Sequence, residues 1–186
     1  MQAGLSLRLF MGFLLASLLG LVVGCSPTYD WRTLSDEAQD WQATFPGKPA
    51  KVERTIQMSL PGGPAAVVLS LRAVRIGEQT FSVGVGRLDQ TAKGPQLMQL
   101  LEALQASRVQ NLQGRITQTS PLPNGRSLVA TGQMTLKPDA APVAARLQMI
   151  SFVHQNQVIE VISAGPVADF NEEAAAQFLE SLKLGL

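Results

Sequence analysis

Residues 65–76 read AAVVLSLRAVRI and residues 80–88 read TFSVGVGRL, with only GEQ between them. The first stretch is long, apolar and rich in β-branched side chains, which favour extended backbone. Two such stretches separated by three residues that include a glycine are typical of a β-hairpin. The sequence therefore predicts a long antiparallel hairpin over residues 65–88.

Strand patterns continue on both sides of this hairpin. Residues 41–45 and 51–60 alternate apolar and polar side chains, the period of a half-buried strand, and FPGKP separates them. Residues 113–138 predict two more strands joined at Pro-Asn-Gly, and residues 145–165 predict another hairpin that turns at Gln-Asn-Gln. Most of the chain is therefore expected to form one antiparallel sheet.

Two segments have helical periodicity instead. Residues 95–112 place four leucines on one side, and Pro95 suits the first helical turn. Residues 168–186 predict a closing helix that either Asp169 or Asn171 caps, with Phe178 and Leu182 on its apolar side. We therefore expect an α+β fold in which the two helices flank the sheet of hairpins as α/β/α layers.

The leader carries the only cysteine of the chain. An apolar run over residues 9–24 is shorter than the roughly 20 residues of a spanning helix and fits a signal peptide. Its end, Val22-Val23-Gly24-Cys25, resembles the lipobox of bacterial lipoproteins. That resemblance implies a signal peptide over residues 1–24, a diacylglycerol on Cys25 and a short tether over residues 25–30. The alternatives are a buried structural thiol or a plain signal anchor.

The residue after the cysteine bears on location. Aspartate there retains lipoproteins of the enterobacterial type in the inner membrane, whereas this chain has Ser26. The resemblance therefore implies an outer-membrane lipoprotein that faces the periplasm. In a Gram-positive host the same anchor implies the outer face of the cell membrane.

The exported part also resembles a known superfamily. A strand ending in FPGKP, a hairpin with a glycine in its turn, a mid-chain helix and a terminal FLESLKL segment resemble PsbP-like proteins, which include small exported lipoproteins. The resemblance implies a single PsbP-like domain over residues 31–186. It also implies a binding or assembly role without catalysis, and it transfers no functional residue.

Charge and composition exclude several classes of function. Without Arg8, the exported chain has fourteen basic and fourteen acidic residues, so it has no field that concentrates nucleic acid. One histidine and one cysteine cannot build a closed zinc site of the common type. No Gly-x-Ser-x-Gly elbow or P-loop occurs, and GVGRL lacks the third glycine of a dinucleotide loop. We therefore expect no enzyme and no cofactor.

Four residues remain as candidates for binding, and each has a structural alternative. Arg72 and Arg75 interrupt the most apolar strand, and Arg87 lies on its expected partner. Such arginines either clamp an anion or pair with acids across strands. Trp31 either presents a ring near the membrane or packs the N-terminal segment onto the domain. His154, at a strand end, is expected to face water.

Two functions fit these observations. The first is a membrane-anchored, non-catalytic module that binds or helps to assemble another envelope protein. The second is a carrier of a small molecule or lipid in a cavity between sheet and helix. A carrier needs an apolar cavity of at least roughly 300 Å³, whereas a binding module is packed shut and has a surface patch.

Overall fold

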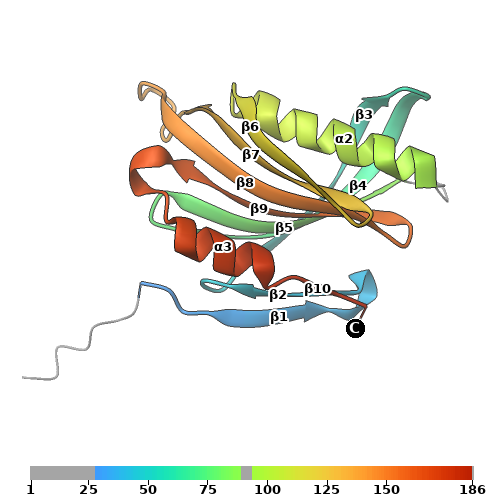
Figure 1. Ribbon diagram of the computed structural model, residues 1–186, viewed down its shortest axis with the longest axis horizontal. Helices are drawn as coiled ribbons and strands as arrows, with labels where there is room; N and C mark the ends of the chain where they lie inside the picture. The colour runs from blue at the N-terminus through green and yellow to red at the C-terminus, as the bar shows by residue number, and fades with distance from the viewer. Residues whose placement is uncertain (1–27, 89–93, 186) are drawn as a thin grey trace, which may run out of the picture.

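The computed structural model describes residues 28–88 and 94–185, so Cys25 lies outside the described residues. The described chain forms two antiparallel sheets and two α-helices (Figure 1). The strands are β1 (Arg32–Asp36), β2 (Trp41–Phe45), β3 (Ala50–Leu60), β4 (Gly63–Ile76), β5 (Gln79–Leu88), β6 (Arg115–Leu122), β7 (Gly125–Met134), β8 (Val143–His154), β9 (Gln157–Pro166) and β10 (Lys183–Leu184). The helices are α2 (Gly94–Asn111), α3 (Glu172–Glu180) and two 3-10 turns, η1 (Glu37–Gln39) and η2 (Val167–Asp169).

The large sheet has seven strands in the order β3-β4-β5-β9-β8-β7-β6. The predicted hairpin is confirmed as β4 and β5, with Arg72 opposite Val83. After β5 the chain crosses one face of the sheet as α2 and returns strand by strand from the far edge. Strand β9 then pairs with β5, where Val83 lies opposite Val161.

Helix α2 covers one face of the large sheet diagonally (Figure 1). Its leucines Leu100, Leu101 and Leu104 are at most 2% exposed and pack against β4 and β9. The helix comes close to the sheet because β5 has a glycine beneath it. A Cβ on Gly86 would lie 3.0 Å from Leu104 Cδ1.

The opposite face carries α3 together with a second, three-stranded sheet in the order β1-β2-β10. Four large aromatic side chains join these elements to the large sheet, and all four are fully buried. The ring centroid of Phe178 in α3 lies 5.1 Å from that of Phe45 in β2 and 5.6 Å, edge-on, from that of Phe81 in β5. Trp41 of β2 completes this aromatic core.

Helix α3 is held at its first turn by polar contacts. Of the two predicted caps, it is Asn171 whose Oδ1 accepts from Ala174 N at 2.9 Å, whereas Asp169 belongs to η2. The buried side chain of Gln79 accepts from Asn171 N at 2.8 Å and donates to Ser163 Oγ at 2.8 Å. These contacts fix the start of α3 to the large sheet.

The expected α/β/α layering is wrong, because the fold is β-rich and a small sheet takes much of the second layer. Two strands of the small sheet, β1 and β10, could not be predicted from the sequence. Strand β1 is mostly exposed, so it shows no alternation, and β10 has only two residues in a segment predicted to be helical. Helix α3 accordingly has nine residues, and Leu182 lies beyond its end and is only half-buried.

Truncation of Phe178 tests whether α3 and the small sheet are integral to the fold. We expect Phe178→Ala to lower the free energy of unfolding by about 3 kcal/mol or more, because it removes the ring that contacts both sheets. Gln177→Ala, an exposed neighbour on the same helix, is the matched control for urea unfolding. A loss below about 1 kcal/mol for Phe178→Ala would mean that α3 is peripheral.

Candidate functional site

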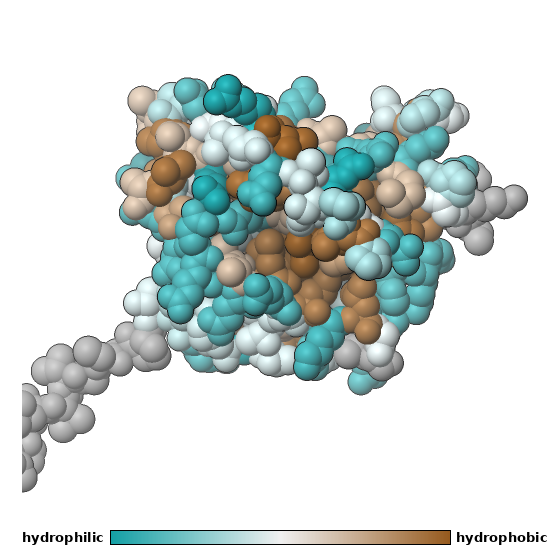
Figure 2. Space-filling view, in the orientation of Figure 1, coloured by the Kyte–Doolittle hydropathy of each residue, from teal (hydrophilic) through white to brown (hydrophobic). Residues whose placement is uncertain are grey.

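The second layer covers only part of the large sheet. The aromatic core takes side chains from β2, β5, β9 and α3, and none from β6 or β7. Half-buried apolar side chains lie on β7, β8 and the end of α3 at the border of the second layer, and those of Ile150, Leu179 and Leu182 also pack against the aromatic core. Figure 2 shows apolar side chains gathered on this side of the molecule with polar ones around them. We call this surface the open face, and its apolar members are Val129, Ile150, Phe152, Leu179 and Leu182.

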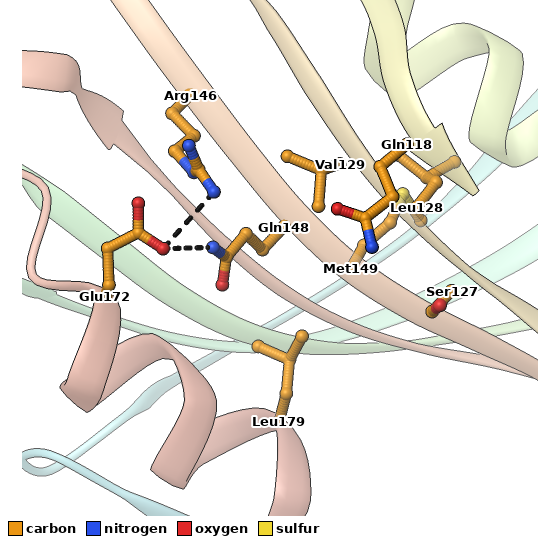
Figure 3. Close-up of a pocket in the computed structure, with 9 residues that line it drawn as sticks. All are labelled: Gln118, Ser127, Leu128, Val129, Arg146, Gln148, Met149, Glu172 and Leu179. Atoms are coloured by element: carbon orange, nitrogen blue, oxygen red, sulfur yellow. Dashed lines mark hydrogen bonds and ion pairs between the residues drawn. The ribbon is translucent and has the colours of Figure 1, made fainter. Parts of the chain in front are cut away.

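A hollow of about 320 Å³ lies on the open face, between β6–β8 and α3. The register places Gln118, Val129 and Gln148 in one row across three neighbouring strands. Leu179 of α3 faces this row (Figure 3). The full lining is Gln118, Ser127, Leu128, Val129, Arg146, Gln148, Met149, Glu172 and Leu179.

One end of the hollow is polar. Glu172, in the first turn of α3, accepts from Arg146 Nη2 at 3.2 Å and from Gln148 Nε2 at 2.9 Å (Figure 3). The guanidinium of Arg146 also lies 5.8 Å from the ring centroid of Phe170. The side chain of Glu172 is 59% exposed and that of Arg146 is 30% exposed. An ion pair this exposed adds at most about 1 kcal/mol to stability, so its groups remain able to bind a ligand.

The lining residues suit binding better than bond-breaking chemistry. Amides, a guanidinium and a carboxylate form hydrogen bonds beside an apolar floor. Ser127, the one hydroxyl in the lining, donates to the Ser120 carbonyl at 3.4 Å rather than to a base. No lining side chain is therefore placed as an activated nucleophile.

The arginines predicted as binding residues do not meet at this hollow. Arg72 Nη2 lies 3.5 Å from Asp36 Oδ2 and so links the two sheets. Arg75 forms an ion pair with Glu78 and donates from Nε to the Gly77 carbonyl at 3.1 Å, which supports the β4–β5 turn. Both therefore fit their structural alternatives.

Arg87 and Trp31 also lie away from the hollow. Arg87 has no ion-pair partner among the residues that the structure describes. Trp31 is partly buried against the aromatic core, with its ring centroid 5.7 Å from that of Tyr29. The aromatic pair packs the N-terminal segment onto the domain.

His154 does not simply face water. Its Nε2 lies 2.7 Å from Asp40 Oδ2, and Gln155 Nε2 donates to the same oxygen at 2.8 Å. The neighbouring Gln157 donates from Nε2 to the Gln39 carbonyl at 2.6 Å. Asp40 ends η1 in the left-handed region, with a φ of 56°. The turn of the β8–β9 hairpin thus binds the connection between β1 and β2, and the histidine joins the two sheets.

The structure also contains a buried acid that sequence reasoning missed. Glu160 of β9 is 1% exposed, and its Oε2 accepts from Arg108 of α2 at 3.0 Å (Nη2) and 3.3 Å (Nε). Burial raises the pKa of the Glu160 carboxyl above its ordinary value of 4.5, against the opposing effect of the charge and hydrogen bond of Arg108. The available signal was a single acid inside the apolar run QVIEVISAG, where an unpaired charge is costly.

No protein-family model matches this chain, and no curated protein or solved structure matches it either. Neither helix in the described part of the chain is long and apolar enough to cross a membrane. Within residues 28–88 and 94–185, no three His, Cys, Asp or Glu side chains come together as a metal site requires.

The raised pKa of Glu160 predicts how stability depends on pH. The folded state binds this proton more tightly than the unfolded state, so the free energy of unfolding falls as pH rises from 4.5 towards the raised pKa. Glu160→Gln keeps an oxygen that accepts from Arg108 and removes the titration. We therefore expect the stability of Glu160→Gln relative to the wild type to increase across this interval, measured by urea unfolding at a series of pH values.

Glu180→Gln, which changes an exposed acid in the same way, is the matched control and should run parallel to the wild type. If the free energies of unfolding of Glu160→Gln and the wild type differ by the same amount at every pH, burial does not raise the pKa of this carboxyl.

Proposed function

We propose that this chain is a non-catalytic envelope lipoprotein, anchored through Cys25, that binds another envelope protein on the open face of β6–β8. The observation that carries the proposal is the incomplete second layer. It leaves apolar side chains of β7, β8 and α3 half-buried beside a hollow with a polar end. Partly exposed apolar surface with a polar rim is characteristic of interaction sites.

The position of Tyr29 and Asp30 in the fold supports a close association with the membrane. Tyr29 already packs against the aromatic core, and Asp30 N donates to the Pro46 carbonyl at 3.1 Å. Only a few residues then separate Cys25 from the domain. At roughly 3.3–3.6 Å per extended residue, the tether reaches about 10–20 Å. This reach favours a partner in or beside the same membrane, which we propose is the outer membrane on its periplasmic side.

The packing of α2 favours the binding module over the carrier. The leucines of α2 pack against β4 and β9, and the close approach at Gly86 leaves no room there for the large apolar ligand of a carrier. The 320 Å³ hollow lies on the other face, is open to solvent and has five polar side chains in its lining. It is a surface feature rather than an enclosed apolar cavity.

The partner is expected on the sheet face and not at a sheet edge. Edge strand β6 has a bulge between Ile116 and Gln118 and a proline at Pro121. Edge strand β3 carries charged side chains at Lys51 and Glu53. Bulges, prolines and charges at an edge all hinder the addition of another strand.

An amphipathic helix of the partner suits this face best. The other face of the same sheet is already covered by a helix, α2, whose leucines recur at helical spacing. A helix on the open face would place its apolar side against Val129, Ile150 and Phe152. A basic side chain at one end would complement Glu172, the more exposed member of its ion pair. Apolar contacts at i, i+3 and i+4 define this mode of binding.

Site-specific photocrosslinking in intact cells tests this proposal. We expect probes at Val129 and at Phe152 to capture the same envelope protein, at residues on one face of the same partner helix. The two probes lie four residues apart along the strand direction, about 13 Å, so the captured residues should be roughly two to three helical turns apart. A probe at Gln57, an exposed position on β3, is the matched control and should not capture that protein. The crosslinked peptides are identified by mass spectrometry.

The anchor is tested separately in the same experiment. Cys25→Ser should remove the protein from the membrane fraction and abolish the crosslink from Val129. Equal capture of the same protein from Val129 and Gln57 would contradict the open face as the binding surface. Unchanged membrane fractionation of Cys25→Ser would contradict the lipobox interpretation.

A further inference from the structure

A second cavity, of about 180 Å³, lies on the α2 side of the large sheet and is independent of the open face. It sits between strands β3, β4 and β5 and the C-terminal half of α2. Its lining includes Val52, Arg54, Leu69, Leu71, Gly84 and Arg108.

Two glycines of β5 explain why the cavity is there. At Gly86 the leucines of α2 touch the sheet, and a Cβ would lie 3.0 Å from Leu104 Cδ1. At Gly84, by contrast, no atom of α2 lies within 4 Å of the place that a Cβ would occupy. A Cβ on Gly84 would meet only Leu71 Cδ1 at 3.6 Å and Glu160 Oε2 at 3.8 Å, which are ordinary contacts. The helix thus passes over Gly86 and leaves the surface at Gly84 uncovered.

The charges that line the cavity are unequal. Arg108 is paired with the buried Glu160, with Nη2 and Oε2 3.0 Å apart. Arg54 lies opposite Leu69 in the register and, within the described chain, has no ion-pair partner. The nearest acid on its own strand, Glu53, pairs with Lys51 at 3.9 Å. The cavity therefore has an apolar floor and, among the described residues, one arginine without an ion-pair partner, Arg54.

We propose that this cavity binds a small organic monocarboxylate with an apolar body. The volume is below the roughly 300 Å³ of pockets for drug-sized ligands, so the body is limited to about one ring or a short acyl chain. Val52, Leu69 and Leu71 contact this body, and Val52, which is 54% exposed, has apolar surface available for it. The Arg54 guanidinium donates to the carboxylate, a charge-assisted contact that can be bidentate.

Benzoate is the probe for this site, with benzamide and benzylamine as neutral and cationic molecules of the same shape. Each is titrated into the purified mature protein, and binding is followed by the amide chemical shifts of Leu71 and Gly84. We expect saturable shifts with benzoate, binding at least roughly tenfold weaker with benzamide, and no saturation with benzylamine.

Two variants locate the site. Gly84→Ala places a methyl group in the floor without a clash and should abolish the saturable shifts. Arg54→Gln should weaken benzoate binding roughly tenfold. Arg115→Gln, which removes one exposed positive charge from the opposite edge strand, is the matched control and should bind benzoate like the wild type.

Equal binding of the three probes would overturn the proposal, because the positive charge would then have no role. Wild-type affinity in both Gly84→Ala and Arg54→Gln would overturn it as well, since benzoate would then be bound elsewhere. Either result leaves the open face of β6–β8 untouched as the proposed site for the protein partner.

Discussion

The central strand of the large sheet, β9, and its neighbour β5 must be covered on both faces. Strand β9 is buried along nearly its whole length, with Val158 and Ile162 facing α2 and Ile159 and Val161 facing the aromatic core. A strand that is apolar on both faces is stable only between two layers. Helix α2 supplies one layer. The short α3 and the three-stranded sheet supply the other, and the ring of Phe178 joins them.

The two layers that cover the large sheet differ in extent, and the candidate sites lie where each layer ends. Helix α2 crosses its face diagonally and reaches β8, but it leaves the surface at Gly84 uncovered. The second layer is centred on β5 and β9 and takes no side chain from β6 or β7 into its core. Contacts from the large sheet hold the second layer there. His154 and Gln157 bind the connection between β1 and β2, and Arg72 of β4 pairs with Asp36 of edge strand β1. The open face remains because those contacts set where the small sheet ends.

Most of the large sheet was predictable from local patterns, whereas the second layer was not. The hairpin predicted over residues 65–76 and 80–88 corresponds to β4 and β5 within two residues, because its apolar residues and its turn are local signals. Strand β1 is polar because it lies exposed at an edge, so nothing in its sequence distinguishes it from a loop. Strand β10 is specified by its pairing with Trp41 and Gln42, which are far away in the sequence.

The sites were less predictable than the fold for a related reason. The hollow combines residues from three strands and α3, and only the register brings Gln118 and Gln148 into one row. Arginines within apolar strands were predicted as candidate binding residues. In the structure, however, Arg72 and Arg75 pair with the acids Asp36 and Glu78. The acid Glu160 was visible in the sequence as an anomaly, but its partner Arg108 lies 52 residues earlier.

Amide hydrogen exchange on the mature protein, purified and in its native membrane, tests the central claim most directly. That claim is that doubly covered strands hold the fold together while the singly covered strands receive a partner. It predicts the slowest exchange in β5 and β9 in both samples. It also predicts that β7 and β8 become more protected only in the native membrane. Identical exchange of β7 and β8 in the two samples would contradict it.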